Sequence, residues 1–154
     1  MKNLANTAEV AALRARIASL RPADTPRWGS MTAAQTVCHM ADSFAGPLGE
    51  HPMPPSTASH PPIPRGLYKW LALYFPRKWP QGVPTIPAMN QQIGGTQPAE
   101  FEADRALLLD RMDRFVACRQ MPSPAHPIFG PMYRKDWMRW GWLHTDHHLR
   151  QFGR

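Results

Sequence analysis

The sequence predicts an all-α protein, a four-helix bundle with a long proline-rich crossover between helices 2 and 3. Four long segments carry apolar residues at helical spacing, and prolines are dense between Pro47 and Pro98. No segment shows the alternation of apolar and polar residues that is typical of a half-buried strand. A chain of 154 residues has the size of one domain, so we expect a single domain over residues 1–154.

The first two helices have clear ends. The first runs from about Thr7 to Leu20 and stops before Pro22, which cannot continue the backbone hydrogen bonds of a helix. The second begins near Thr32, where "TAAQ" has the form of a capping box completed by Gln35, and it ends near Pro47. Its apolar stripe comprises Val37, Met40, Ala41, Phe44 and Leu48.

The crossover contains one short helix. Within it, "PRGLYKWLALYFPRKWP" predicts an amphipathic helix that needs a packing partner, and the flanking segments are too rich in proline for sheet interiors. A connection of this length in a compact domain is usually a functional flap or lid. The third long helix is expected over about Pro98 to Cys118, and the fourth over about Arg134 to Phe152.

The net charge of +7 raises the question of a nucleic-acid partner. Lysines and arginines are scattered, with no run of five or more and no DNA- or RNA-reading signature, so we expect no specific nucleic acid. An anionic small-molecule substrate fits the same charge. No stretch of about 20 apolar residues is present, which predicts no membrane association and a cytoplasmic protein. Cys38 and Cys118 lack a CxxC context and are expected as free thiols.

The run "HTDHH" near the end of the chain is the main candidate for chemistry. His144 and His148 are four residues apart, so they share one helix face and can close on one metal ion. Trp140 and Gly141 lie near that face, which predicts an apolar interior with space left at the glycine. His147 is turned about 60° from His144 and either flanks this pocket or faces outward.

A third ligand must come from elsewhere in the chain. His39, in "TVCHMADS" on the second helix, is the candidate, because bundles build metal sites from inward residues on facing helices. Spacing alone leaves the alternative of ordinary histidines with hydrogen-bond partners equally open. Among the others, His51 and His60 are expected to be solvated, and His126 to fix a turn.

Other chemistries find little support in the sequence. It contains no nucleophile elbow, P-loop or dinucleotide-binding motif. Asp136 and Asp146 both lie on the last helix, with no carboxylate demonstrably opposite, so a pair of acid–base carboxylates is not predicted.

The segments "RWGSMTAAQTVCHMADSF", "GVPTIPAM", "HPIFGPM" and "WLHTDHHLRQFG" resemble a branch of the DinB-like (YfiT-like) superfamily of metalloenzymes, usually labelled a domain of unknown function. The similarity covers almost the whole chain. It implies a four-helix bundle and a divalent metal held by His39, His144 and His148, with His147 as a neighbour. In one departure, Tyr133 stands where that branch tends to have a small capping hydroxyl.

Characterised members of that superfamily include metal-dependent thiol S-transferases and a thiol-dependent isomerase. The resemblance therefore implies an enzyme that activates a thiol or water for transfer to a small electrophile or for hydrolysis. The alternative is a non-enzymatic metal- or small-ligand-binding stress protein. Zinc or nickel is expected before iron or copper. The expected partner is a small-molecule substrate, with a low-molecular-weight thiol as one candidate, and the aromatic surface is compatible with a homodimer.

Overall fold

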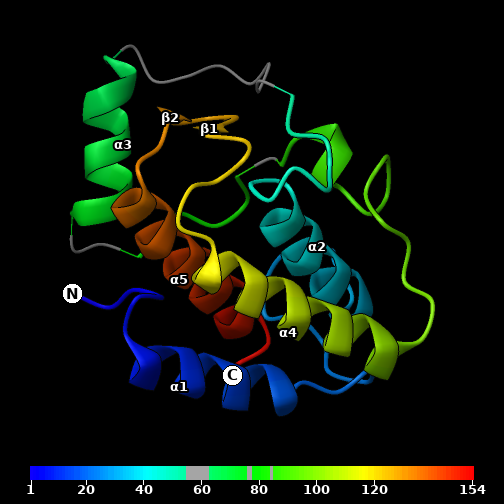
Figure 1. The fold of residues 1–154 in the computed structure, drawn as a ribbon. Coiled ribbons are helices and arrows are strands. Elements are labelled where there is room, and N and C mark those ends of the chain that lie inside the picture. The colour runs from blue at the N-terminus through cyan, green and yellow to red at the C-terminus, as the bar shows by residue number, and fades with distance from the viewer. Residues whose placement is uncertain (55–62, 76–77, 84) are drawn as a thin grey trace.

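The computed structural model describes residues 1–54, 63–75, 78–83 and 85–154 (Figure 1). In these ranges the protein is mostly helical, as predicted, and α1, α2, α4 and α5 pack around one core. The elements are α1 (Thr7–Ala18), α2 (Ala33–Ala45), α3 (Arg65–Tyr74), the 3-10 helix η1 (Pro87–Met89), α4 (Phe101–Ala117), β1 (Ala125–His126), β2 (Gly130–Pro131) and α5 (Arg134–Gln151).

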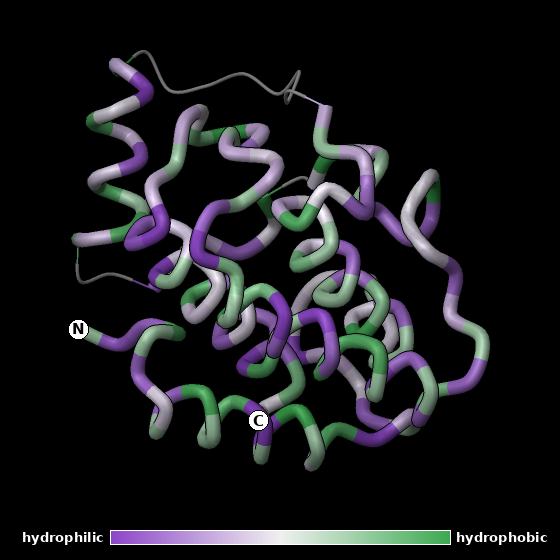
Figure 2. Tube along the Cα trace, in the orientation of Figure 1, coloured by the Kyte–Doolittle hydropathy of each residue, from purple (hydrophilic) through white to green (hydrophobic). Residues whose placement is uncertain are grey.

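The expected helices correspond to α1, α2, α4 and α5, and the short amphipathic helix of the crossover is α3. Residues 55–62, which include His60, lie outside the described part of the chain. The sequence did not predict the antiparallel ribbon of β1 and β2, because two residues per strand are too few to show any alternation. In Figure 2, hydrophilic and hydrophobic residues are interspersed along the helices. None of the described helices is long and apolar enough to cross a bilayer.

Helix α2 is the central helix of the bundle. Its capping box is present as predicted: the Gln35 N–H donates to Thr32 Oγ1 over 3.2 Å, and the Thr32 N–H donates to Gln35 Oε1 over 3.0 Å. After this first turn, every residue from Thr36 to Ala45 is buried. The helix is therefore covered on all sides, and polar side chains within it need partners inside the protein.

Asp42 is fully buried on α2 and joins the second half of the crossover to the bundle. Its carboxylate accepts hydrogen bonds from Gln91 Nε2 (3.0 Å) and from the backbone N–H (2.9 Å) and hydroxyl (2.7 Å) of Thr96. Arg111 of α4 lies 3.4 Å from the same group. The segment after η1 is thus fixed to α2 and α4 by one charged side chain.

Gly141 on α5 serves helix packing. A Cβ atom there would lie 2.6 Å from Leu4 Cδ1 and 3.2 Å and 3.3 Å from the rings of Phe115 and Phe44. The Leu4 N–H also donates to the carbonyl of Met138 over 3.0 Å. The expectation that Gly141 leaves space beside the histidines is wrong, because the N-terminal segment and the core aromatics fill that space.

Asp136 anchors the first turn of α5. Its carboxylate accepts hydrogen bonds from the Tyr74 hydroxyl, from Lys69 Nζ (3.1 Å) and from the Tyr133 N–H (3.1 Å). The Tyr133 side chain is 75% exposed and makes no capping hydrogen bond, so Asp136 caps the helix in its place. The same contacts hold α3 against α5.

Asp42→Ala is expected to lower the free energy of unfolding by about 3 kcal/mol, because it removes a buried acceptor and leaves the donors of Gln91, Thr96 and Arg111 without their partner. Urea denaturation measures the change. The control is Asp113→Ala, which removes a surface ion pair with Arg14 and should cost less than about 1 kcal/mol. Equal losses in the two variants would contradict the anchoring role of Asp42.

Candidate metal centre

His39 projects from α2 toward α5 and is 4% exposed. Its Nδ1 lies 2.8 Å from the carbonyl oxygen of Met89 in η1. A carbonyl only accepts hydrogen bonds, so Nδ1 carries the proton and Nε2 of the neutral ring carries a free lone pair. The crossover thus determines which ring nitrogen of His39 is available as a ligand.

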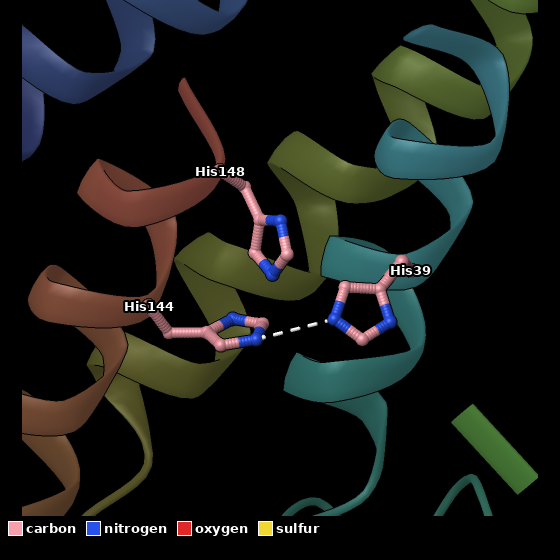
Figure 3. A group of neighbouring side chains, drawn as sticks. All are labelled: His39, His144 and His148. Carbon is pink, nitrogen blue, oxygen red and sulfur yellow. Dashed lines mark hydrogen bonds between the residues drawn. The ribbon is translucent and has the colours of Figure 1, made fainter. Parts of the chain in front are cut away.

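His144 and His148 lie one turn apart on α5 and face His39 (Figure 3). The Nε2 atoms of His39 and His144 are 3.2 Å apart and form a hydrogen bond, in which His144 donates to the lone pair of His39 in the absence of an ion. Ring centroids are 5.1 Å apart for His39 and His144, and 4.7 Å apart for His39 and His148. One nitrogen from each ring lies within 4.8 Å of the other two. The structure therefore brings together the three histidines that the sequence predicted as ligands.

His148 is oriented by a second hydrogen-bond chain. Gln151 Nε2 donates to the Trp28 carbonyl over 2.7 Å, which turns Gln151 Oε1 toward His148 Nδ1 at 3.1 Å. Because this oxygen only accepts, the proton of neutral His148 lies on Nδ1 and its Nε2 is free. His39 and His148 are thus both held with Nε2 available as a metal ligand.

Burial lowers the pKa of His39, and it lowers the pKa values of His144 and His148 well below their ordinary range. Proximity adds to the effect at His144 and His148, because a positive charge on one imidazole disfavours a second one nearby. All three rings are therefore neutral near pH 7. Neutral imidazole is the form that binds metal ions.

The spacing of His39 and His144 fits a small divalent ion. Two imidazole nitrogens bound to one tetrahedral ion at bond lengths of about 2.0–2.1 Å lie about 3.3 Å from each other. The separation of 3.2 Å between His39 Nε2 and His144 Nε2 is close to that value. The hydrogen bonds to Met89 and Gln151 are of the kind that orients metal-binding histidines.

His147 lies beside the cluster and is not part of it. Its ring centroid is 5.3 Å from that of His148, 5.9 Å from that of Trp28 and 6.3 Å from that of Trp79. Its buried Nδ1 has no hydrogen-bond partner among the described residues. Of the two positions that the sequence left open, the structure shows His147 flanking the pocket.

The other described histidines are structural. His126 Nδ1 accepts the N–H groups of Ile128 (3.1 Å) and Phe129 (3.3 Å), which confirms that it fixes a turn. His51 Nε2 donates to the Ala88 carbonyl over 2.7 Å, and its side chain is only 15% exposed. The expectation that His51 is solvated is wrong, because it ties the start of the crossover to η1.

The remaining candidates for chemistry are occupied or inert. Both cysteines are free thiols, as predicted, and burial raises the pKa of Cys38 to about 12. Asp146 is paired with Arg16 and Arg150, and Asp136 with Lys69. Within the described part of the chain, the partners of these two carboxylates are basic side chains.

A cavity of about 840 Å³ opens above the cluster, and His39, His144 and His148 form part of its wall. The other walls come from α3, from the segment around β1 and from the second half of the crossover. Trp28 and Trp79 also line this cavity, and the sequence did not predict this role for either residue. Their only sequence signal is an aromatic residue in a loop, which does not show what the ring faces.

The fold and the site together define this protein as a helical bundle with a buried three-histidine cluster in the wall of a cavity. The model of the family described as "Protein of unknown function (DUF1569)" matches residues 2–154. The chain belongs to this family. No match was found among curated proteins or among solved structures.

His126 provides a test of the packing beside the cluster. Burial lowers its pKa to about 3, well below the value of 6.5 in an unfolded chain. Its neutral form therefore stabilises the fold above pH 6.5, and this contribution is lost as the pH falls from 6.5 toward 3. Between pH 6.5 and pH 4.5 the loss is about 2 kcal/mol.

His126→Asn keeps an acceptor for the N–H groups of Ile128 and Phe129 but cannot be protonated. We expect the variant to be less stable at pH 7, because its side chain no longer stacks on Phe129. Its unfolding free energy should fall less steeply between pH 6.5 and pH 4.5, as measured by urea denaturation across that range. Identical pH slopes in the wild type and the variant would show that His126 is protonated equally in the folded and unfolded states.

Proposed function

We propose that this protein is a metal-dependent enzyme of the DinB-like type. In this proposal His39, His144 and His148 hold one divalent ion, with zinc or nickel expected before iron or copper. The observation that carries the proposal is the convergence of three neutral imidazoles from two facing helices at the wall of a cavity. The order of the histidines along the chain agrees with the resemblance of the sequence to that superfamily.

Three protein ligands are the arrangement of catalytic zinc sites, since structural sites are usually closed by a fourth. An ion held this way lowers the pKa of a bound thiol or water, so the proposed reaction is transfer of a thiol to a small electrophile, or hydrolysis. A low-molecular-weight thiol in the cytoplasm is the proposed co-substrate. These assignments rest on the donor set and on the resemblance.

The protein's own residues position the ligands. The Met89 carbonyl and Gln151 each hold one imidazole with its free nitrogen toward the cluster, and the Trp140 ring stacks on His144 with centroids 5.0 Å apart. The rings are thus arranged before any ligand binds, which reduces the free-energy cost of ordering them.

Untagged protein is expected to bind one divalent ion per chain, and His144→Ala should lose it. His147→Ala is the matched control, because His147 is on the same helix and next to the cluster but not part of it. Elemental analysis after purification, followed by calorimetric titration with zinc and nickel, measures both. Absence of stoichiometric metal in the wild-type protein, or equal loss in the two variants, would overturn the assignment of ligands.

Gln151→Leu is expected to weaken metal binding by about 10- to 100-fold, because the ring of His148 loses the acceptor that orients it. Calorimetric titration against wild type gives the ratio. Gln92→Leu is the control, since the side chain of Gln92 is exposed and makes no hydrogen bond to His39, His144 or His148. An unchanged affinity in Gln151→Leu would remove Gln151 from the site.

A screen of low-molecular-weight thiols against several electrophiles tests whether the protein is an enzyme. We expect metal-dependent turnover that His144→Ala abolishes. A tightly bound metal with no turnover, in this screen or with hydrolysable esters and amides, would favour the non-enzymatic binding protein.

A further inference from the structure

We propose that the cavity above the histidine cluster selects an uncharged, predominantly apolar substrate with a group of aromatic size. This inference rests on the proposed function, in which the same molecule is the electrophile or the compound that is hydrolysed. It follows from the lining of the cavity, from the fixed positions of its rings and from the placement of charge around it.

Apolar side chains from separate parts of the chain face the cavity. They include Tyr68, Leu71 and Ala72 of α3, Ile128 and Phe129 after β1, and Trp140 of α5. Trp28 and Trp79 add two indole rings close to His147. A volume of about 840 Å³ is within the range for small-molecule sites and accommodates an aromatic compound together with a thiol.

The aromatic rings are held by contacts with the protein. Trp79 donates its indole N–H to the Ala72 carbonyl over 2.7 Å, which fixes this ring against α3. Phe129 stacks on His126 with ring centroids 4.6 Å apart, and Tyr68 lies at 5.7 Å from Phe129. Rings held in place in this way offer flat surfaces for a ligand ring at little entropic cost.

Lysine and arginine side chains are sparse in the lining of this cavity. Many of the arginines are paired with carboxylates on the bundle, as in the contacts of Arg14 with Asp113 and of Arg16 with Asp146. Among the described residues that line the cavity, Lys78 is the one lysine or arginine, and its side chain is exposed. In the metal-free protein, an anion inside the cavity would therefore lose hydration without gaining a buried cationic partner.

Two fluorescent probes that differ by one charged group test the proposal. N-phenyl-1-naphthylamine is neutral, and 8-anilinonaphthalene-1-sulfonate has the same rings with a sulfonate added. Fluorescence titrations of the metal-free protein give both dissociation constants. We expect the neutral probe to bind at least about tenfold more tightly, because burying the sulfonate is unfavourable. Equal or tighter binding of the sulfonate would overturn the proposal.

A matched pair of variants on α3 locates the bound probe. Leu71 lines the cavity and Leu67 does not, although both leucines are partly exposed, at 38% and 47%. Leu71→Asp should weaken binding of the neutral probe by about tenfold, and Leu67→Asp should leave it within about twofold. Equal losses in both variants, or no loss in either, would place the probe outside the cavity and overturn the proposal.

Thermal unfolding monitored by circular dichroism shows whether each variant folds. If a variant on α3 does not fold, a second pair of variants still tests the proposal. Val83 lines the cavity and Ile93 does not, and both residues are exposed, at 54% and 69%. Val83→Asp should weaken neutral binding and Ile93→Asp should not. Probe binding to the metal-free protein needs no ion, so a failure here is separate from a failure to bind metal.

Discussion

Burial of α2 beyond its first turn is the constraint on which the rest of the structure depends. A helix covered on every side must find internal partners for its polar groups, and α2 carries His39 and Asp42 within its buried turns. Met89 satisfies one ring nitrogen of His39, and Gln91 and Thr96 satisfy Asp42. The second half of the crossover is therefore held on α2 by two side chains that are one turn apart.

The same constraint connects fold and site. The hydrogen bond that satisfies His39 also leaves its other nitrogen directed at α5, where His144 lies 3.2 Å away. On α5, the Gln151 side-chain oxygen accepts from His148 Nδ1 and leaves the other ring nitrogen of His148 free. The Gln151 amide is itself held by donating to the Trp28 carbonyl. A cluster of neutral imidazoles is therefore assembled by backbone carbonyls and one amide, without a carboxylate in contact with it among the described residues.

The sequence was most informative where a pattern is local. The "TAAQ" box located the start of α2, and the spacing of His144 and His148 placed both rings on one face. It was least informative where a residue's role depends on a distant partner. A glycine is needed at position 141 because Leu4 packs against it, and His51 is held by its hydrogen bond to the Ala88 carbonyl. No sequence periodicity links the residues of either pair. Met89 contributes through its carbonyl, which is the same for every residue type, so its identity carried no signal.

The histidine cluster has a consequence for how the protein reaches its native state. His39 and His144 are separated by 105 residues, so a ribosome completes α2 long before the opposite half of the cluster is synthesised. The rings meet only where α5 packs against α2. A contact of such high sequence separation carries a loop-closure entropy that the packing of α5 against α2 must offset. The geometry of the three rings therefore depends on contacts between segments that are far apart in the sequence.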